Sequence, residues 1–258
     1  MIHETAIIEE GAIISADVEI GPYTVIGAHV EIGEGTWIGP HVVINGHTQI
    51  GTHNKIYQFS SIGEANQDKK YNGEPTKTVI GDHNHIREFT TIHRGTAQDL
   101  GVTSIGSHNL LMAYVHVAHD CTIHDHCILA NNATIAGHVV LEDWVILGGF
   151  TGIHQFCHIG AHAFTAMSAS IAKDVPPFVM ADGHPALPRG LNIEGLKRRN
   201  FNSEQIKLIK QAYKILYRSG HTLSQALDIL SQLEQETAST HIRHLIDFID
   251  ASDRGIIR

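Results

Sequence analysis

Isoleucine occupies every sixth position near the start of the chain. The series runs without a gap through Ile2, Ile8, Ile14, Ile20, Ile26, Ile32, Ile38, Ile44, Ile50, Ile56 and Ile62. A period of six is neither the 3.6 of an α-helix nor the 2 of a plain β-strand. It is typical of a backbone that turns a corner every six residues and stacks coil upon coil, as in hexapeptide-repeat parallel β-helices.

The positions around the isoleucines support this interpretation. From Ile2 to Ile44, the fourth residue after the isoleucine is small or β-branched, as a tight corner beside a narrow core requires: Ala6, Ala12, Val18, Thr24, Val30, Thr36, Val42 and Thr48. The residue directly after the isoleucine is often glycine, as at positions 21, 27, 33, 39, 51 and 63. We attribute these glycines to the freedom in φ that a corner can use.

The period survives two interruptions. It resumes in the same frame at Ile80, Ile86 and Ile92, and in a shifted frame at Ile105, Leu111, Val117, Ile123, Leu129, Ile135, Leu141, Leu147, Ile153 and Ile159, before it weakens towards Ile171. Three hexads form one triangular coil, so the sequence predicts about eight or nine coils in a prism roughly 40 Å long. We therefore expect a left-handed parallel β-helix, the hand known for hexapeptide proteins, over residues 1–185, with insertions near 64–79 and 94–104.

The pattern becomes helical towards the carboxyl terminus. A proline-rich stretch follows Ile171, and apolar residues recur at spacings of three and four from residue 203. Gly220 ends that helix, Thr222 and Gln225 form a capping-box start for the next, and a last helix is expected over 240–251. We predict a C-terminal α-helical domain over 186–258 that covers a strand edge of the prism.

Composition limits the cellular location. The chain of 258 residues has no apolar segment that approaches the ~18 residues needed to span a bilayer, and Met1 to Glu4 do not resemble a signal peptide. Cys121, Cys127 and Cys157 all occupy the small core position of the repeat, so we expect free, buried thiols. These features predict a cytoplasmic protein without membrane insertion.

Charge is distributed unevenly. The formal net charge is −9, yet residues 189–218 hold a basic cluster with only Glu194 and Glu204 as acids. This stretch is either a solvated helix face or a dock for an acidic partner or phosphates, with Arg189, Lys197, Lys207, Lys210, Lys214 and Arg218 as the candidate contacts. Nucleic acid is disfavoured because the chain is acidic and no aromatic residue interrupts the run 197–199.

The 18-residue coil turns histidine positions into spatial predictions. Gly137 and Gln155 should stack above His119, and His138 should stack above Asp120, with His116 one short step earlier. Imidazoles beside an unobstructed glycine N–H can supply a general base and an oxyanion donor. Asp120 could orient or charge-stabilise one of the imidazoles.

Three other functions remain open at this point. Zinc bound by His83, His119 and His124 would indicate a carbonic-anhydrase-like solenoid, but the frame shift after Arg94 does not assure their alignment. A different hexapeptide acyltransferase could use acyl-CoA. A non-catalytic scaffold would make the imidazole cluster incidental. We expect no metal and no cofactor.

Several motifs resemble one enzyme family over nearly the whole chain. They are Asn66-Gln-Asp68, Ile92-His-Arg-Gly95, His116-Val-Ala-His-Asp-Cys121, Leu129-Ala-Asn-Asn-Ala133, Ala136-Gly-His138, His154-Gln-Phe-Cys157, Asn192-Ile-Glu-Gly-Leu-Lys-Arg-Arg199 and Tyr217-Arg-Ser-Gly220. Together they resemble the bacterial UDP-N-acetylglucosamine O-acyltransferases that begin lipid A synthesis. A hexapeptide repeat alone is shared by many acyltransferases, whereas this combination is far more specific.

The resemblance implies a homotrimer with its active site in the cleft between neighbouring prisms. It implies transfer of a 3-hydroxyacyl group from acyl carrier protein to the sugar 3-hydroxyl of UDP-N-acetylglucosamine. His119 would be the general base, Asp120 its assistant and the Gly137 N–H the oxyanion donor. The substrate-binding residues it implies are Gln67, Asp68, Lys70, His93, His116, His138, His154 and Gln155, with Asn192, Glu194, Arg198 and Arg199 at the nucleotide.

One position departs from the long-chain members of that family. They have glycine where this chain has Met167, and relatives with methionine there are known for shorter acyl chains. Met167 follows Ala113, Asn131 and Gly149 in its column, so its thioether would plug a groove along the prism. The departure implies a donor of about 10 to 12 carbons, since the axial distance from His119 is roughly 13 Å by coil counting.

Overall fold

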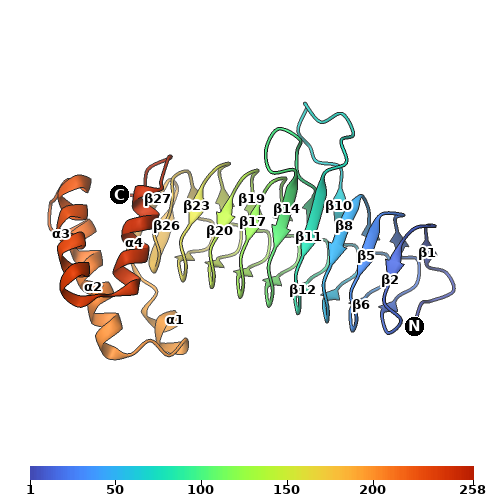
Figure 1. The fold of residues 1–258 in the computed structure, drawn as a ribbon, viewed down its shortest axis with the longest axis horizontal. Helices are drawn as coiled ribbons and strands as arrows, with labels where there is room; N and C mark the ends of the chain where they lie inside the picture. The colour runs from blue at the N-terminus through green and yellow to red at the C-terminus, as the bar shows by residue number, and fades with distance from the viewer.

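A computed structural model describes residues 1–258 as a triangular prism of stacked coils that ends in a group of helices (Figure 1). Three parallel β-sheets form the walls, and each coil adds one short strand to each sheet. The expected left-handed parallel β-helix is confirmed.

The three sheets take their strands in strict rotation. Sheet 1 contains β1 (Ile7–Ile8), β4 (Val25–Ile26), β7 (Val43–Ile44), β10 (Ser61–Glu64), β13 (Thr91–His93), β16 (His116–Val117), β19 (Thr134–Ile135), β22 (Gly152–Ile153) and β25 (Ser170–Ile171). Sheet 2 contains β2 (Ile13–Ile14), β5 (Val30–Ile32), β8 (His47–Ile50), β11 (Lys77–Ile80), β14 (Val102–Ile105), β17 (Thr122–Ile123), β20 (Val140–Leu141) and β23 (His158–Ile159). Sheet 3 contains β3 (Glu19–Ile20), β6 (Trp37–Ile38), β9 (Lys55–Ile56), β12 (His85–Ile86), β15 (Leu110–Leu111), β18 (Ile128–Leu129), β21 (Ile146–Leu147), β24 (Phe164–Thr165), β26 (Val179–Gly183) and β27 (Ala186–Leu191).

Both interruptions of the period are loops that leave the prism on the same side (Figure 1). The first insertion lies between β10 and β11, and the second between β13 and β14. The register across them is kept, since Ser61 pairs with Thr91 and Thr91 pairs with His116. Each insertion therefore adds chain to one corner without disturbing the columns above and below it.

The isoleucine column forms the core. Ile26, Ile38, Ile44 and Ile56 are 0% exposed, and their counterparts in later coils are equally buried. The three cysteines occupy this core as buried free thiols, as expected. Burial raises the pKa of Cys121 and of Cys127 to about 12, so these thiols stay protonated and unreactive.

The corner glycines have a different cause from the one expected. Gly21 and Gly33 do not have positive φ, and a Cβ atom on either would come within 2.7 Å of backbone in the next coil. Close approach of successive coils therefore excludes a side chain there. Among the glycines of this series, only Gly63 has a positive φ, of +71°.

The left-handed backbone position falls two residues later and is seldom glycine. It is occupied by Tyr23, His41, His53, Phe59, His83, Phe89, His108, Tyr114, Asp120, His126, Asn132, His138, Trp144, Phe150, Phe156, His162 and Ser168. Rings at this position stack from coil to coil, as Phe89 and Tyr114 do with centroids 4.8 Å apart. Seven of the 21 histidines occupy this position.

Sheet 3 continues into the proline-rich segment that follows Ile171. Strand β26 pairs in parallel with β24 and in antiparallel with β27, so the proline-rich segment extends sheet 3 as a hairpin. The expected boundary between residues 185 and 186 falls inside that hairpin, because the backbone of β27 forms its hydrogen bonds with β26. Four helices follow: α1 (Ile193–Arg198), α2 (Ser203–Arg218), α3 (Leu223–Thr237) and α4 (Thr240–Asp250).

The helices largely follow the expected pattern. The capping box of Thr222 and Gln225 opens α3, as predicted, whereas α1 was not foreseen. None of the helices has the length and apolar character that crossing a bilayer requires.

A partly buried carboxylate fastens the helices to the prism. Glu142 Oε2 accepts hydrogen bonds from His244 Nε2 of α4 and from the Ala161 N–H, both at 2.7 Å. His158 Nε2 lies 3.0 Å from Glu142 Oε1. Burial alone would raise the pKa of Glu142, but these imidazoles and the N–H outweigh it and hold the pKa well below its usual range. The Glu142 hydrogen bond in turn raises the pKa of His244.

The hydrogen bond between Glu142 and His244 predicts a pH-dependent contribution to stability. Because the pKa of His244 is raised on folding, its stabilisation is complete below the unfolded value of about 6.5 and is lost as pH rises through the folded value. Urea unfolding should therefore show that His244→Ala costs more free energy of unfolding at about pH 6 than at about pH 9.

His241→Ala, on the same helix, is the matched control for this prediction. Burial lowers the pKa of His241, so the cost of its replacement should change with pH in the opposite direction. If His244→Ala lowered the free energy of unfolding equally at both pH values, the contact between Glu142 and His244 would not be a charged pair.

Candidate active site

The largest cavity, of about 1160 Å³, opens between the two insertions and the corner that follows sheet 1. Residues from both insertions line one side, including Gln67–Lys70, Thr96 and Gln98–Leu100. Four histidines from the prism line the other side, namely His93, His116, His119 and His138. The insertions therefore turn a flat corner into a deep site.

The coil arithmetic places the central residues correctly. The His138 N–H donates to the His119 carbonyl at 3.1 Å, and the Phe156 N–H donates to the Gly137 carbonyl at 3.1 Å. The His119 ring lies directly over Gly137, where a Cβ atom would meet Cε1 at 2.5 Å. The predicted column of His119 and Gly137 is thus confirmed, and the ring explains why residue 137 has no side chain.

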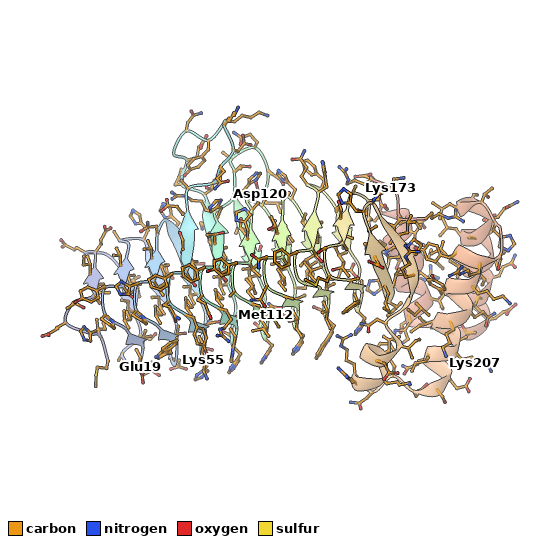
Figure 2. The ribbon with its side chains drawn as sticks, turned by 180° about the vertical axis from the view of Figure 1, so that it is seen from behind. Glu19, Lys55, Met112, Asp120, Lys173 and Lys207 are labelled. Carbon is orange, nitrogen blue, oxygen red and sulfur yellow. The ribbon has the colours of Figure 1, made fainter.

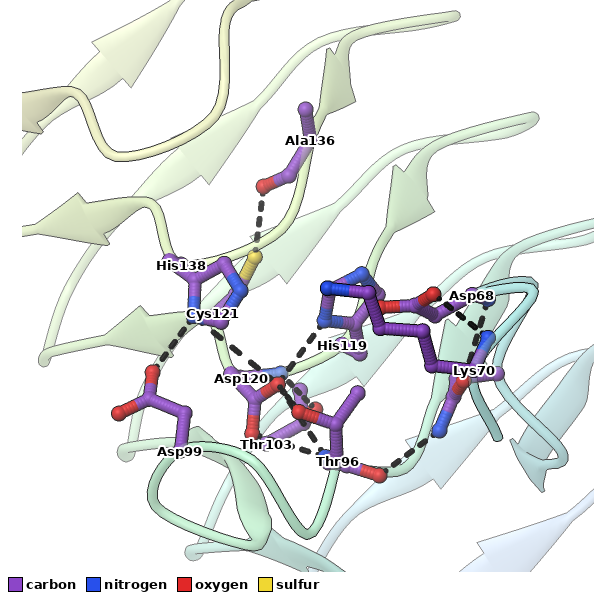
Figure 3. A network of polar contacts seen from close by, with 12 residues as sticks. Asp68, Lys70, Thr96, Asp99, Thr103, His119, Asp120, Cys121, Ala136 and His138 are labelled. Atoms are coloured by element: carbon purple, nitrogen blue, oxygen red, sulfur yellow. Dashed lines mark hydrogen bonds and ion pairs between the residues drawn. The ribbon is translucent and has the colours of Figure 1, made fainter. Parts of the chain in front are cut away.

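His119 and Asp120 form a hydrogen-bonded pair (Figure 3). His119 Nδ1 lies 2.9 Å from Asp120 Oδ2, and the Asp120 side chain is 0% exposed. An ionised carboxylate can only accept, so Nδ1 carries the proton and Nε2 is left to accept another. Burial opposes ionisation of Asp120, but hydrogen bonds from His119 and Thr96 outweigh it and lower its pKa. This arrangement can act chemically as a general base.

Two further histidines are held neutral. Burial lowers the pKa of His116 to about 4, and His116 Nδ1 lies 2.7 Å from Thr91 Oγ1. Burial also lowers the pKa of His93, whose ring meets that of His116 edge to face at 5.0 Å. Near neutral pH these rings can contribute hydrogen bonds to a ligand without a charge.

The second insertion contributes contacts that the sequence did not reveal. Asp99 Oδ2 lies 2.5 Å from His138 Nδ1, and the His138 ring stacks on Phe156 with centroids 4.3 Å apart. Thr96 and Thr103 contact Asp120. Only the position of these residues in or beside an interruption of the repeat could have drawn attention to them.

The structure brings together most of the predicted substrate-binding residues. Those that line the cavity are Gln67, Asp68, Lys70, His93, His116, His138 and Gln155. His154 does not line it and is exposed, with its ring near the Gln155 carbonyl.

The predicted nucleotide-binding residues lie on another edge of the same prism. Asn192 Nδ2 donates to the His162 carbonyl at 3.0 Å, and the Arg199 guanidinium lies 5.0 Å from the ring centre of Trp144. Trp144 and His162 belong to the corner that follows sheet 2. Glu194 and Arg198 of α1 are exposed, with residues 194 and 197 paired at 2.8 Å. None of the predicted nucleotide-binding residues lines the cavity of His119.

Met167 lies on the third edge, the corner that follows sheet 3, and is 68% exposed. It does not line the cavity. Figure 2 shows Met112, from the same corner, on the side of the prism away from Asp120. A groove from His119 to Met167 therefore does not run within one chain.

The zinc alternative is not supported by the arrangement of its histidines. His83 stacks between His53 and His108 on the corner that follows sheet 2, whereas His119 lies on the corner that follows sheet 1. The group whose ligand atoms lie within 4.8 Å of one another is His119, Asp120 and His138. There the oxygens of Asp120 already accept from Thr96 and His119.

Comparisons with known proteins agree over the whole chain. The family model described as Udp N-acetylglucosamine O-acyltransferase, Domain 2, matches residues 174–257, and the bacterial transferase hexapeptide model matches 29–64 and 103–137. The acyl-[acyl-carrier-protein]–UDP-N-acetylglucosamine O-acyltransferase of Thiobacillus denitrificans is 59% identical over 258 residues, 100% of this chain and 99% of that protein. The corresponding protein of a Janthinobacterium species is 59% identical over 260 residues, with the same coverage.

Solved structures show the same likeness. The UDP-N-acetylglucosamine acyltransferase of Francisella novicida is 44% identical with a TM-score of 0.97, over 100% of this chain and 94% of that one. The UDP-N-acetylglucosamine O-acyltransferase of Moraxella catarrhalis is 48% identical with a TM-score of 0.96, over 100% and 99%.

The contact between His119 and Gly137 predicts the effect of one added methyl group. Gly137→Ala should push the imidazole away and break its hydrogen bond to Asp120, because the new Cβ would overlap the ring. The downfield NMR signal of the His119 Nδ1 proton should then disappear. Gly152→Ala, at a site with nothing within 4 Å, should leave the signal in place; its survival in Gly137→Ala would contradict the packing described.

Proposed function

The chain belongs to the family of UDP-N-acetylglucosamine O-acyltransferases and is an acyltransferase, and we propose that His119 is the base with which it acylates UDP-N-acetylglucosamine. The acyl donor is a 3-hydroxyacyl group on acyl carrier protein, and the product is the first intermediate of lipid A synthesis. The observation that carries the proposal is the His119–Asp120 pair beside Gly137 in the largest cavity.

The reaction needs one base, one oxyanion donor and no cofactor. His119 Nε2 takes the proton of the sugar 3-hydroxyl while the hydroxyl oxygen attacks the carbonyl carbon of the thioester. The Gly137 N–H stabilises the negative charge on the carbonyl oxygen. The C–S bond then breaks, an ester remains on the sugar, and the protonated His119 returns the proton to the leaving thiolate. Asp120 stays ionised and stabilises the imidazolium.

The remaining cavity residues fit a polar substrate with an acyl chain. Gln67, Asp68 and Lys70 reach the cavity from the first insertion, opposite the neutral rings of His93 and His116. We propose that these groups, with His138, His154 and Gln155, position the sugar and the donor. Neutral imidazoles suit this role because they can bind hydroxyl and carbonyl groups without attracting water as strongly as a charge does.

We propose a homotrimer in which the cavity lies in the cleft between two prisms. The corner that follows sheet 3 carries an exposed stripe of rings, contributed by Tyr23, Phe59, Phe89, Tyr114 and Phe150. Contiguous exposed apolar surface is typical of protein interfaces. A second copy would also supply what one chain lacks at its own cavity, namely the nucleotide contacts of Asn192, Glu194, Arg198 and Arg199.

The same assembly accounts for Met167. Its exposed side chain belongs to the corner with the stripe of rings, so in a trimer it can reach a neighbour's acyl groove. We propose that it ends this groove and selects donors of about 10 to 12 carbons. Donor competition that favours about 14 carbons in the wild-type enzyme would refute this role.

We propose that α2 docks the carrier protein. Lys207, Lys210, Lys214 and Arg218 follow one another at helical spacing on an exposed side of α2, and Arg189 and Lys197 precede them in the chain. Acyl carrier protein is acidic, so this surface is complementary to it. The proposed substrates of this protein and its three free thiols favour a cytoplasmic location.

The central test is an acylation assay read by mass spectrometry. Wild-type protein with UDP-N-acetylglucosamine and 3-hydroxyacyl carrier protein should give the acylated nucleotide sugar. His119→Ala should keep its fold but lose on the order of 10² to 10⁴ in rate, as expected for loss of a general base. His83→Ala, an exposed ring outside the cavity, is the control and should keep its rate; near-normal kcat in folded His119→Ala would refute the assignment.

The docking surface predicts a donor-specific defect. Reversal of charge at Lys207, Lys210 and Lys214 should slow acylation from carrier protein and leave a short acyl-pantetheine donor almost unaffected. The wild-type preference for carrier protein should also fall as salt rises, because screening weakens attraction between exposed charges. An equal loss with both donors would indicate that the lysines form an ordinary solvated face.

A further inference from the structure

The carboxylate of Asp120 is held by more than its histidine. The Thr96 N–H donates to Oδ1 at 2.9 Å and to Oδ2 at 3.1 Å, and the Thr96 hydroxyl donates to Oδ2 at 2.7 Å. The Asp120 N–H donates to Thr103 Oγ1 at 2.9 Å. Figure 3 shows Thr96 and Thr103 gathered around Asp120. Three of its carboxylate contacts thus come from a single residue of the second insertion.

The second insertion is shaped to bring Thr96 to this place. It leaves the coil at Gly95, where a Cβ atom would lie 2.2 Å from the Val102 nitrogen and 2.8 Å from Asp120 Oδ1. The Gly95 carbonyl accepts a hydrogen bond from Asn66 Nδ2 of the first insertion at 2.9 Å, and Asn66 is buried. Both insertions are therefore fastened beside the same carboxylate.

Alignment of this carboxylate matters for the chemistry of His119. Asp120 has a left-handed backbone with φ of 57°, and its side chain could otherwise turn away from the ring. The donors of Thr96 fix the plane of the carboxylate while Oδ2 faces His119 Nδ1. This in turn fixes the tautomer and direction of the imidazole, on which proton transfer depends.

We propose that Thr96 is a positioning residue for acyl transfer, acting through Asp120 on His119. The inference rests on the proposed function, in which His119 is the base. Thr96 borders the cavity but is only 2% exposed, and its hydroxyl already donates to Asp120 Oδ2, so we assign this hydroxyl to the carboxylate and not to a bound substrate. Its proton does not move during the reaction, since the transferred proton passes from the sugar hydroxyl to His119 Nε2 and then to the thiolate.

The test compares two substitutions at one position. Thr96→Val keeps the shape but removes the hydroxyl, and kcat should fall roughly 10-fold to 100-fold with KM nearly unchanged. The acid limb of the kcat/KM profile should move to higher pH, because a carboxylate with fewer donors holds the imidazolium more tightly. Thr96→Ser restores the hydroxyl and should recover most of the rate.

Thr78→Val is the matched control. Thr78 lies on β11 and pairs with Thr103 in register, and it is equally buried, but its hydroxyl has no hydrogen-bond partner. The same loss of a buried hydroxyl should therefore leave kcat and the pH profile unchanged. If Thr78→Val lost as much rate as Thr96→Val, the loss would come from disturbed packing and not from the contact with Asp120.

Three outcomes overturn the proposal: wild-type kcat in Thr96→Val, an unmoved acid limb, or a Thr96→Ser variant as slow as Thr96→Val. If circular dichroism shows that Thr96→Val does not fold, Thr96→Ala removes the same hydroxyl, and its comparison with Thr96→Ser poses the same question. A wild-type protein that does not acylate the sugar would instead contradict the proposed function, so the two failures are distinguishable.

Discussion

The hydrogen bonds between successive coils determine nearly every other feature of this protein. Each coil pairs in register with the next. A residue's place in the hexad therefore determines whether it lies on a strand or at a corner, and whether it is buried or exposed. The core is then a stack of isoleucine, leucine and valine, and the close spacing of coils dictates glycine at positions such as Gly21 and Gly137. Gly137 is the case in which this spacing places a backbone beside the imidazole of His119.

The candidate site arises where this regularity is broken. The prism alone offers flat walls and narrow corners, neither of which encloses a ligand. The two insertions build one wall of the cavity and provide the donors that hold Asp120. The regular part positions His119 and Gly137 by register, and the irregular part supplies the cavity wall and the hydrogen-bond donors around them.

The repeat and the column of His119 and Gly137 could be predicted from the sequence because register is arithmetic. The contacts of Thr96 and Asp99 could not, since the path of a loop outside the repeat follows no period. The cause of the corner glycines was also missed, because steric contact with the next coil and freedom in φ select the same residue. The hairpin β26–β27 was missed because its prolines masked a strand pairing at the end of sheet 3.

The in-register stacking of coils also restricts how the length of the chain can change. Deletion of one residue within a coil shifts every later residue by one place in the hexad, so buried isoleucines would move to the surface along the rest of the prism. Deletion within the first insertion, between Glu64 and Lys77, leaves that frame intact. Such a protein can vary in length mainly in the insertions that line its cavity, so a change in length also changes the shape of the cavity.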